Sequence, residues 1–422
     1  MFLAALEIQN FRSIAHQRLD FSGEDGAVRK RTVFIGDNGT GKTSILQAIG
    51  LVMAGSDCLP ALVGDPNDWI RAGEVKCRIV AHIVTKAGRP REVELELVRD
   101  QGVAELLRHN QENLERLDAA LGHSPRNYLT IGYGPFRRLG GGSGASLDRI
   151  NVSNRALRSR SVATLFDCDA SLISVQAWAM DVHYRGGDTG LGQVMQALNL
   201  LLPGLEFSHL DRDDGDLIFN TPDGLLPLRM LNGGFQMMAS WCGDLLYRVG
   251  EVFKDYENPL EARGLLLLDE IELHLHPRWQ RELVEFLDER LPNFQIIGTT
   301  HSPLLAQQMG ENELHVVTRS RDDPATQIEV FHGSPQRLMA HQMLLDPSFG
   351  ISTMESFQVE RMRTEYRALR AAPQLDADQS ARLQELGILL DDLPVWGAET
   401  ELDRENRDLM RDIRNALTGQ TP

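Results

Sequence analysis

The most constraining feature of this sequence is residues 32–53, which read TVFIGDNGTGKTSILQAIGLVM. A short apolar run ends in a glycine-rich octet, and apolar residues then recur at helical spacing. This order predicts a strand, a phosphate-binding loop and a helix. Glycines at 36, 39 and 41 allow the backbone N–H groups to converge on phosphate oxygens, and the helix N-terminus adds a partial positive charge there. The alternative is a glycine-rich turn before an ordinary helix, which the surrounding pattern disfavours.

Each residue type in this loop suits the binding of a nucleoside triphosphate with magnesium. Lys42 is expected to bridge the β and γ phosphates, and the Thr43 hydroxyl to coordinate the metal. Upstream, residues 3–21 predict two strands around a turn, where Arg12 is either a nucleotide contact or a plain surface arginine. The predicted nucleotide-binding residues of the loop are Gly36, Asp37, Asn38, Gly39, Thr40, Gly41, Lys42, Thr43 and Ser44.

Residues 264–270, GLLLLDE, predict the second half of the site. An apolar run without alternation is typical of a strand buried on both faces, as in a parallel sheet covered by helices. Ligands of open α/β sheets bind at the carboxyl ends of such strands. Asp269 is therefore a predicted magnesium ligand and Glu270 the predicted acceptor of a proton from the attacking water. Alternatively, the two acids only cap the next helix.

A second apolar strand is predicted over 294–298, and His301 follows it closely. An imidazole at the tip of a buried strand, beside a γ-phosphate, can hydrogen-bond that phosphate. A lone histidine is more often structural, but its place relative to the two other motifs favours a functional role.

The net charge of the chain limits how it could bind nucleic acid. There are 43 Lys and Arg against 60 Asp and Glu, a net charge of −17, so bulk electrostatics repel a phosphate backbone. Residues 128–160 reverse this sign, with six arginines, from Arg137 to Arg160, against the single acid Asp148. This segment is predicted to touch nucleotide phosphates, a neighbouring subunit or a nucleic acid backbone, unless it is a solvated loop.

Four motifs together resemble the ABC-type ATPase heads of the SMC, RecF and OLD group, within the prokaryotic AAA-family ATP-binding proteins. They are residues 6–13 (LEIQNFRS), the phosphate loop, residues 267–277 (LLDEIELHLHP) and residues 299–303 (TTHSP). The resemblance implies an α/β fold: a P-loop NTPase head with a mostly parallel sheet flanked by helices, an N-terminal antiparallel β part, a helical lobe and a C-terminal helical extension. It implies ATP and magnesium as cofactors. It assigns Lys42, Glu270 and His301 to catalysis and Thr43 and Asp269 to the metal.

The same resemblance implies that two heads pair, as a homodimer or a higher oligomer. Residues 273–276 would lie where the family has its dimer-contacting loop. In residues 231–236 (LNGGFQ), Asn232, Gly233 and Gly234 would bind the γ-phosphate held by the opposite subunit, although the family usually has serine in place of Asn232. A β-turn without a ligand is the alternative for this segment.

Four regions are expected along the chain. Residues 1–100 and 241–333 form the two halves of the ATPase lobe, residues 101–240 an inserted helical and arginine-rich lobe, and residues 334–422 a helical extension with amphipathic stretches at 354–370, 377–390 and 398–417. After His301 we expect no nuclease domain. Widely spaced cysteines and the absence of a long apolar run predict a cytoplasmic protein without a membrane contact.

This layout resembles the ATPase subunits of prokaryotic phage-defence modules, the Septu PtuA group in particular, which work with a separately encoded nuclease. The resemblance implies an ATP hydrolase that senses a trigger and regulates an effector chain, through which nucleic acid would be met. The alternative is a RecF- or SMC-like DNA-repair ATPase that binds DNA directly through Arg137–Arg160.

Overall fold

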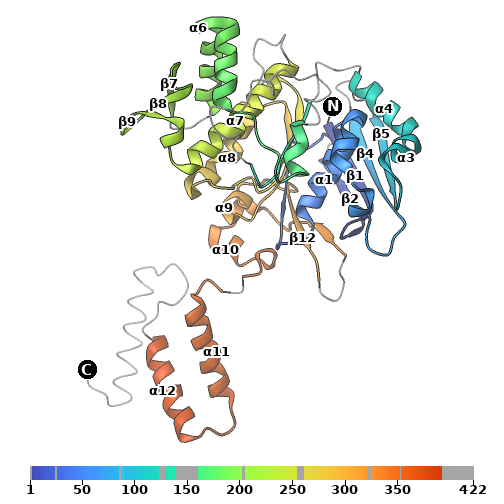
Figure 1. Ribbon diagram of the computed structural model, residues 1–422. Helices are drawn as coiled ribbons and strands as arrows, with labels where there is room; N and C mark the ends of the chain where they lie inside the picture. The colour runs from blue at the N-terminus through green and yellow to red at the C-terminus, as the bar shows by residue number, and fades with distance from the viewer. Residues whose placement is uncertain are drawn as a thin grey trace. The chain divides into compact units, whose positions relative to one another are not determined.

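The computed structural model describes residues 2–23, 26–84, 88, 90–122, 129–137, 160–201, 205–253, 261–320, 325–351 and 353–391 (Figure 1). The chain divides into two compact units, Met1–Ile351 and Ser352–Pro422, which are described separately.

A six-stranded sheet forms the centre of the first unit. Its strands are β13 (Gln327–Val330), β12 (Leu314–Thr318), β3 (Arg31–Ile35), β11 (Phe294–Thr299), β10 (Gly264–Leu268) and β6 (Leu129–Tyr133), in that spatial order. All neighbours pair in parallel except β13, which runs antiparallel to β12. Every residue of β10 is buried, as its uninterrupted apolar run predicts. The predicted fold class, a mostly parallel α/β sheet, is confirmed.

Side-chain alternation along β10 explains why both of its faces are apolar. Leu265 and Leu267 belong to a core shared with the first helix and the N-terminal sheet. Leu266 and Leu268 belong to a second core, shared with the helices on the opposite face. The strand therefore separates two hydrophobic cores, and a polar residue at any of these positions would enter one of them.

A second, antiparallel sheet covers one of these cores. It contains β2 (Ile14–Asp20), β1 (Phe2–Phe11), β4 (Lys76–Val84) and β5 (Pro90–Val98), in that order. The two strands predicted over residues 3–21 are confirmed as the hairpin of β1 and β2, and β4 and β5 form a second hairpin. Helices α2 (Leu59–Val63), α3 (Val103–His109) and α4 (Gln111–Gly122) accompany this part.

Helix α1 (Lys42–Met53) packs between the two sheets, in contact with β1 and β4 on one side and β10 and β11 on the other. This explains why all its residues except Thr43 are buried. No single helix among the described residues has the length and hydropathy to cross a membrane; the bent pair Lys42–Met53 and Ser56–Val63, with 118° between its helices, passes that test by length and composition only.

The opposite face of the central sheet carries further helices of the first unit. They are α6 (Val175–Leu201), which is kinked at Gly187, α7 (Gly233–Val252), α8 (Pro277–Arg290), α9 (Pro303–Ala306) and α10 (Ala340–Leu344). A three-stranded antiparallel sheet stands between α6 and α7 in the chain: β7 (Glu206–Asp211), β8 (Asp216–Thr221) and β9 (Gly224–Pro227). This sheet lies in a lobe that was expected to be helical, so that expectation is wrong for residues 206–227.

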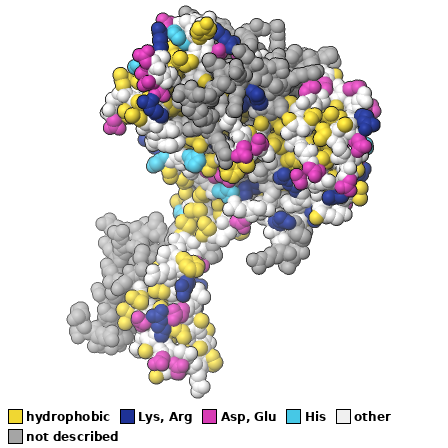
Figure 2. Space-filling view, in the orientation of Figure 1, with side chains coloured by type: hydrophobic (Ala, Val, Ile, Leu, Met, Phe, Trp, Pro, Cys, Tyr) yellow, Lys and Arg dark blue, Asp and Glu magenta, His cyan; other side chains and the backbone are white. Residues whose placement is uncertain are grey.

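The second unit is a helical hairpin of α11 (Phe357–Ala371) and α12 (Ala377–Asp391) (Figure 1). An ion pair between Arg382 and Glu365 joins the two helices. Apolar and charged side chains are mixed on its surface (Figure 2), and Phe357 and Ile388 are 75% and 70% exposed. Two of the three amphipathic stretches are thus confirmed as helices; the third, residues 398–417, lies outside the described residues.

A buried histidine on β12 predicts how stability depends on pH. His315 is 5% exposed, and its ring lies 5.5 Å from that of Phe34. Burial, and next the charge of Arg29, lower the pKa of His315 from 6.5 to about 4. Between pH 6.5 and pH 4, His315 is therefore protonated in the unfolded chain but neutral in the folded chain. The free energy of unfolding consequently falls as the pH falls through this range.

We expect His315 to cost on the order of 3 kcal/mol of the free energy of unfolding between pH 6.5 and pH 4. Urea unfolding at a series of pH values measures this loss. A His315→Gln variant should show a shallower pH dependence than the wild-type chain over that window. Parallel curves for the two proteins would contradict the prediction.

Candidate functional site

One cavity gathers the three predicted motifs. It has a volume of about 410 Å³ and lies where β3, β10 and β11 end. Its walls come from the phosphate loop, the two acids after β10 and the loop after β11, which are more than 200 positions apart at their extremes. The lining residues are Arg12, Ser13, Asn38, Gly39, Gly41, Lys42, Thr43, Ser44, Asp269, Glu270, Thr299, His301 and Arg319. Among the predicted loop residues, Gly36, Asp37 and Thr40 do not line it.

The loop needs its glycines for two separate reasons. Gly39 and Gly41 have φ angles of +77° and +108°, which L side chains rarely adopt. Gly36 also has a positive φ, and a Cβ there would lie 2.0 Å from the carbonyl oxygen of Val317. Gly41 precedes α1 without a side-chain cap, so the first N–H groups of that helix receive no side-chain acceptor from this position. An anion is a suitable partner for them.

Lys42 is held inside the loop. Its ammonium group donates hydrogen bonds to the carbonyl oxygens of Gly36 and Asp37, both at 2.8 Å. Burial lowers the pKa of Lys42, while the charge of Asp269 acts in the opposite direction. The cation is thus kept over the centre of the loop by acceptors that phosphate oxygens can replace.

The two predicted metal ligands touch each other. Thr43 donates from Oγ1 to Oδ2 of Asp269 at 2.7 Å, and Thr299 donates to Oδ1 of the same carboxylate at 2.6 Å. Asp269 is 2% exposed. A hydroxyl and a carboxylate oxygen are hard donors that suit Mg²⁺, so these two side chains are of the kind that would hold a magnesium ion.

Glu270 has an unusual backbone. Its φ is +49°, and its N–H donates to Thr299 Oγ1 at 2.8 Å. The next helix, α8, is capped by His276, whose side chain accepts from the Arg278 N–H. The reading of the two acids as caps of the next helix is therefore wrong.

Arg137 belongs to the segment predicted to touch nucleotide phosphates, a neighbouring subunit or nucleic acid, unless it is a solvated loop. For Arg137 the solvated alternative is wrong: it is 2% exposed, and its Nη2 donates to the carbonyl oxygens of Asp269 at 2.7 Å and Glu270 at 3.0 Å. Its guanidinium lies 6.0 Å from the ring centre of Trp241. The pKa of Arg137 is lowered by burial, against the charge of Asp269. Arg160 is exposed, and residues 138–159 lie outside the described residues.

Arg12 lines the cavity, in agreement with its predicted position near the loop. Its Nη1 donates to Gln47 Oε1 at 2.6 Å, and its guanidinium lies 4.2 Å from the ring centre of Trp69. Burial lowers the pKa of Arg12, and Asp68 opposes that shift. The side chain is thus fixed between α1 and an aromatic ring rather than free on the surface.

The segment of Asn232, Gly233 and Gly234 lies elsewhere. It does not line the cavity of its own chain and begins α7, where Asn232 Oδ1 accepts from the Phe235 N–H at 3.0 Å. A Cβ on Gly234 would lie 2.9 Å from the carbonyl oxygen of His274. The segment therefore packs against residues 273–276, and its role toward an opposite subunit stays a prediction.

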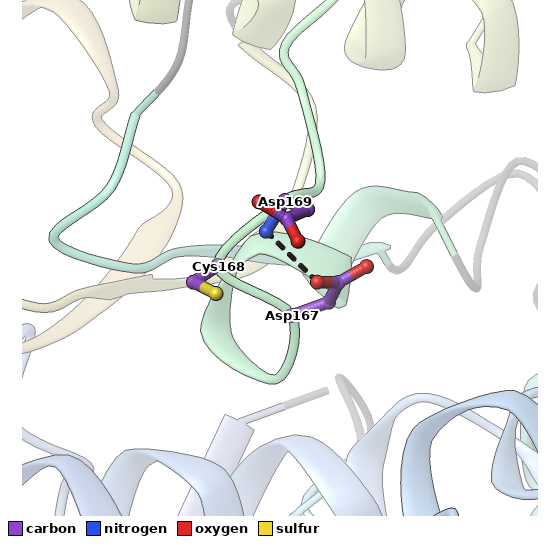
Figure 3. A group of neighbouring side chains, drawn as sticks. All are labelled: Asp167, Cys168 and Asp169. Atoms are coloured by element: carbon purple, nitrogen blue, oxygen red, sulfur yellow. Dashed lines mark hydrogen bonds between the residues drawn. The ribbon is translucent and has the colours of Figure 1, made fainter.

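A separate group of potential ligands is exposed. Asp167, Cys168 and Asp169 follow one another in a turn, and the Asp169 N–H donates to Asp167 Oδ1 (Figure 3). All three side chains are exposed. The carboxylate of Asp167 closes a local turn, which accounts for the arrangement without a metal.

Comparison with known proteins agrees with the motifs. A family model described as "AAA ATPase domain" matches residues 1–96, and one described as "AAA domain, putative AbiEii toxin, Type IV TA system" matches residues 256–306. The "Septu protein PtuA" of Bacillus mycoides (strain KBAB4) is 26% identical over 327 residues, 77% of this chain and 41% of that protein. The "Retron Ec83 probable ATPase" of Escherichia coli is 33% identical over 124 residues, 29% of this chain and 23% of that protein.

Among solved structures, the "SMC head domain from Thermotoga maritima" is 17% identical with a TM-score of 0.41, covering 79% of this chain and all of that one. The match with PtuA spans about two fifths of the length of that relative, and the match with the retron protein about a quarter. The two family models match the segments that contain the phosphate loop, the acids after β10 and His301. The chain is thus similar to RecF-type ATPases over part of its length and is PtuA-like over most of it.

Proposed function

We propose that this protein binds and hydrolyses ATP between paired heads and thereby regulates a separately encoded effector, a nuclease, in prokaryotic anti-phage defence. The observation that carries the ATPase part is the cavity that joins the glycine-rich loop, Asp269, Glu270 and His301. The defence part is supported by the similarity to PtuA and to a retron ATPase. The effector is inferred from the layout of the chain.

In this proposal each lining residue has a chemical task. The loop amides and Lys42 bind the β and γ phosphates, with Lys42 exchanging its two carbonyl acceptors for phosphate oxygens. Thr43 and Asp269 would hold magnesium, which when bound neutralises developing charge on the phosphates. Glu270 accepts a proton from the attacking water. His301 donates a hydrogen bond to the γ-phosphate.

The opposite head completes the site in this proposal. Asn232, Gly233 and the exposed N-terminus of α7 would face the γ-phosphate bound by the partner head. ATP then joins two heads, and hydrolysis loosens them. That change in assembly is the signal that we propose the effector receives.

The pairing can be tested through Gly233. A Cβ at Gly233 meets no atom within 4 Å, and an acid in the first turn of a helix suits the helix dipole, so Gly233→Asp should fold normally. Its charge would nevertheless repel the partner's γ-phosphate. The molar mass of each variant is measured by light scattering with Mg-ATP. The Glu270→Gln variant should double in mass, and the double variant with Gly233→Ala should do the same. The double variant with Gly233→Asp should keep the mass of a monomer. Equal masses for all three with and without ATP would refute the ATP-bridged pair.

The alternative, a repair ATPase that binds DNA directly, has support from similarity to RecF over 29% of the chain. This alternative depends on the arginines between residues 137 and 160 as the DNA-binding surface. Arg137 is buried and therefore does not belong to such a surface. Salt-dependent DNA binding by the isolated chain, lost when Arg155, Arg158 and Arg160 become alanine, would favour it over the regulator.

A further inference from the structure

A third acid, Glu272, connects the loop after β10 to the loop after β11 and does not itself line the cavity. Its Oε2 accepts from Thr300 Oγ1 at 2.6 Å, and its Oε1 accepts from the backbone N–H of His301, also at 2.6 Å. Both oxygens of one carboxylate thus bind two consecutive residues that lie 28 and 29 positions further along the chain. Hydrogen bonds to a charged acceptor are among the stronger ones in proteins.

Among the described residues, the other side-chain hydrogen bonds that involve these two loops do not reach the backbone of His301. Thr299 binds Asp269 and the Glu270 N–H, and Gln280 accepts from Ser302 Oγ at 2.6 Å while donating to the carbonyl oxygen of Leu275 at 2.8 Å. The bond from Glu272 reaches the main chain of His301 itself. Because the imidazole stays exposed and lines the cavity, this anchor fixes the backbone of the histidine and leaves its side chain available.

The charge of Glu272 argues against a purely electrostatic benefit. Its carboxylate is near enough to act on Lys42 and Arg137, and it adds to the negative charge of Asp269 and Glu270 beside a cavity that would receive a polyanion. On charge alone, a neutral residue would admit a triphosphate more readily. A geometric role explains an acid at this position, since two acceptor oxygens are needed for the two donors.

We propose that Glu272 is a positioning residue that sets His301 at the correct distance from the γ-phosphate, and that it ties this distance to Glu270, two residues earlier in the same loop. The inference rests on the proposed ATPase function. It assigns to Glu272 an effect on the rate of hydrolysis that is transmitted only through His301.

Steady-state kinetics can separate this role from binding. Glu272→Ala should lower kcat on the order of 10- to 100-fold, as expected for a displacement of about 1 Å, while the KM for ATP stays unchanged or falls because a negative charge is removed. In a His301→Ala background the same substitution should cost nothing further. Glu282→Ala, at an exposed position on α8, is the matched control and should keep wild-type kinetics.

A second measurement needs no turnover. Hydrogen exchange at the His301 amide should be slow in the wild-type chain and fast in Glu272→Ala, with the amides of α8 unchanged in both. An inactive wild-type protein would refute the ATPase function and leave this measurement to decide on the anchor. A His301 amide that stays protected in Glu272→Ala, an unchanged kcat, or an additive loss in the double variant would each overturn the proposal.

Discussion

Lys42→Ala is expected to abolish ATP binding, and Glu270→Gln to lower turnover by about 10²- to 10⁴-fold while ATP binding persists. Lys42 is the buried cation at the centre of the loop, so its loss removes the charge that the phosphates meet. Glu270→Gln keeps the shape of the side chain but cannot accept the proton of the attacking water. Binding of a fluorescent ATP analogue and release of phosphate measure the two effects separately.

Matched controls exist within the same unit. Lys30→Ala removes a lysine that pairs with Asp288, and Glu285→Gln changes an exposed acid on α8; neither residue lines the cavity. Both controls should bind and hydrolyse ATP like the wild-type chain. Unchanged turnover in Lys42→Ala or in Glu270→Gln would refute the assignment of the site.

The parts of the site that could be predicted are those whose residue types are determined by neighbouring residues in the sequence. The glycines of the phosphate loop are required by backbone geometry within eight residues, and the run before Asp269 is apolar because β10 is buried on both faces. Parallel strands place their carboxyl ends at one edge of a sheet, so the acids and His301 follow from the strand assignment. Here local pattern and tertiary arrangement agree.

Arg137 could not be predicted because its partners are backbone carbonyls 132 and 133 positions away. Backbone acceptors carry no signal in a sequence, and a count of charges treats a buried arginine like a solvated one. The useful clue was position: Arg137 follows β6, the strand beside β10, by only four residues.

The sheet of β7, β8 and β9 was missed for a different reason. Its strands are four to six residues long, and β9 exposes Leu225 at 57%, so any alternation between buried and exposed side chains extends over few residues. Short strands with exposed apolar residues cannot be told from loops by periodicity. Their pairing depends on tertiary contacts that a single sequence does not reveal.

Asp244→Ala is expected to destabilise the first unit by about 3–5 kcal/mol, because it leaves a buried cation without its counter-ion. Asp244 is fully buried on α7, pairs with Arg248 one turn later and accepts from the Tyr133 hydroxyl at 2.7 Å and from the Ile173 N–H at 2.9 Å. One carboxylate thus links α7, β6 and the segment before α6. Urea unfolding followed by tryptophan fluorescence measures the loss.

The exposed pair of Arg278 and Glu282 on α8 has the same spacing of four residues and provides the comparison. Its side chains are 78% and 55% exposed, so Glu282→Ala should change stability by no more than about 0.5 kcal/mol. Changing Asp244 to leucine and Arg248 to methionine together should recover much of the loss, since no unpaired charge then remains buried. Equal losses at Asp244 and Glu282 would mean that burial does not decide the contribution of these pairs.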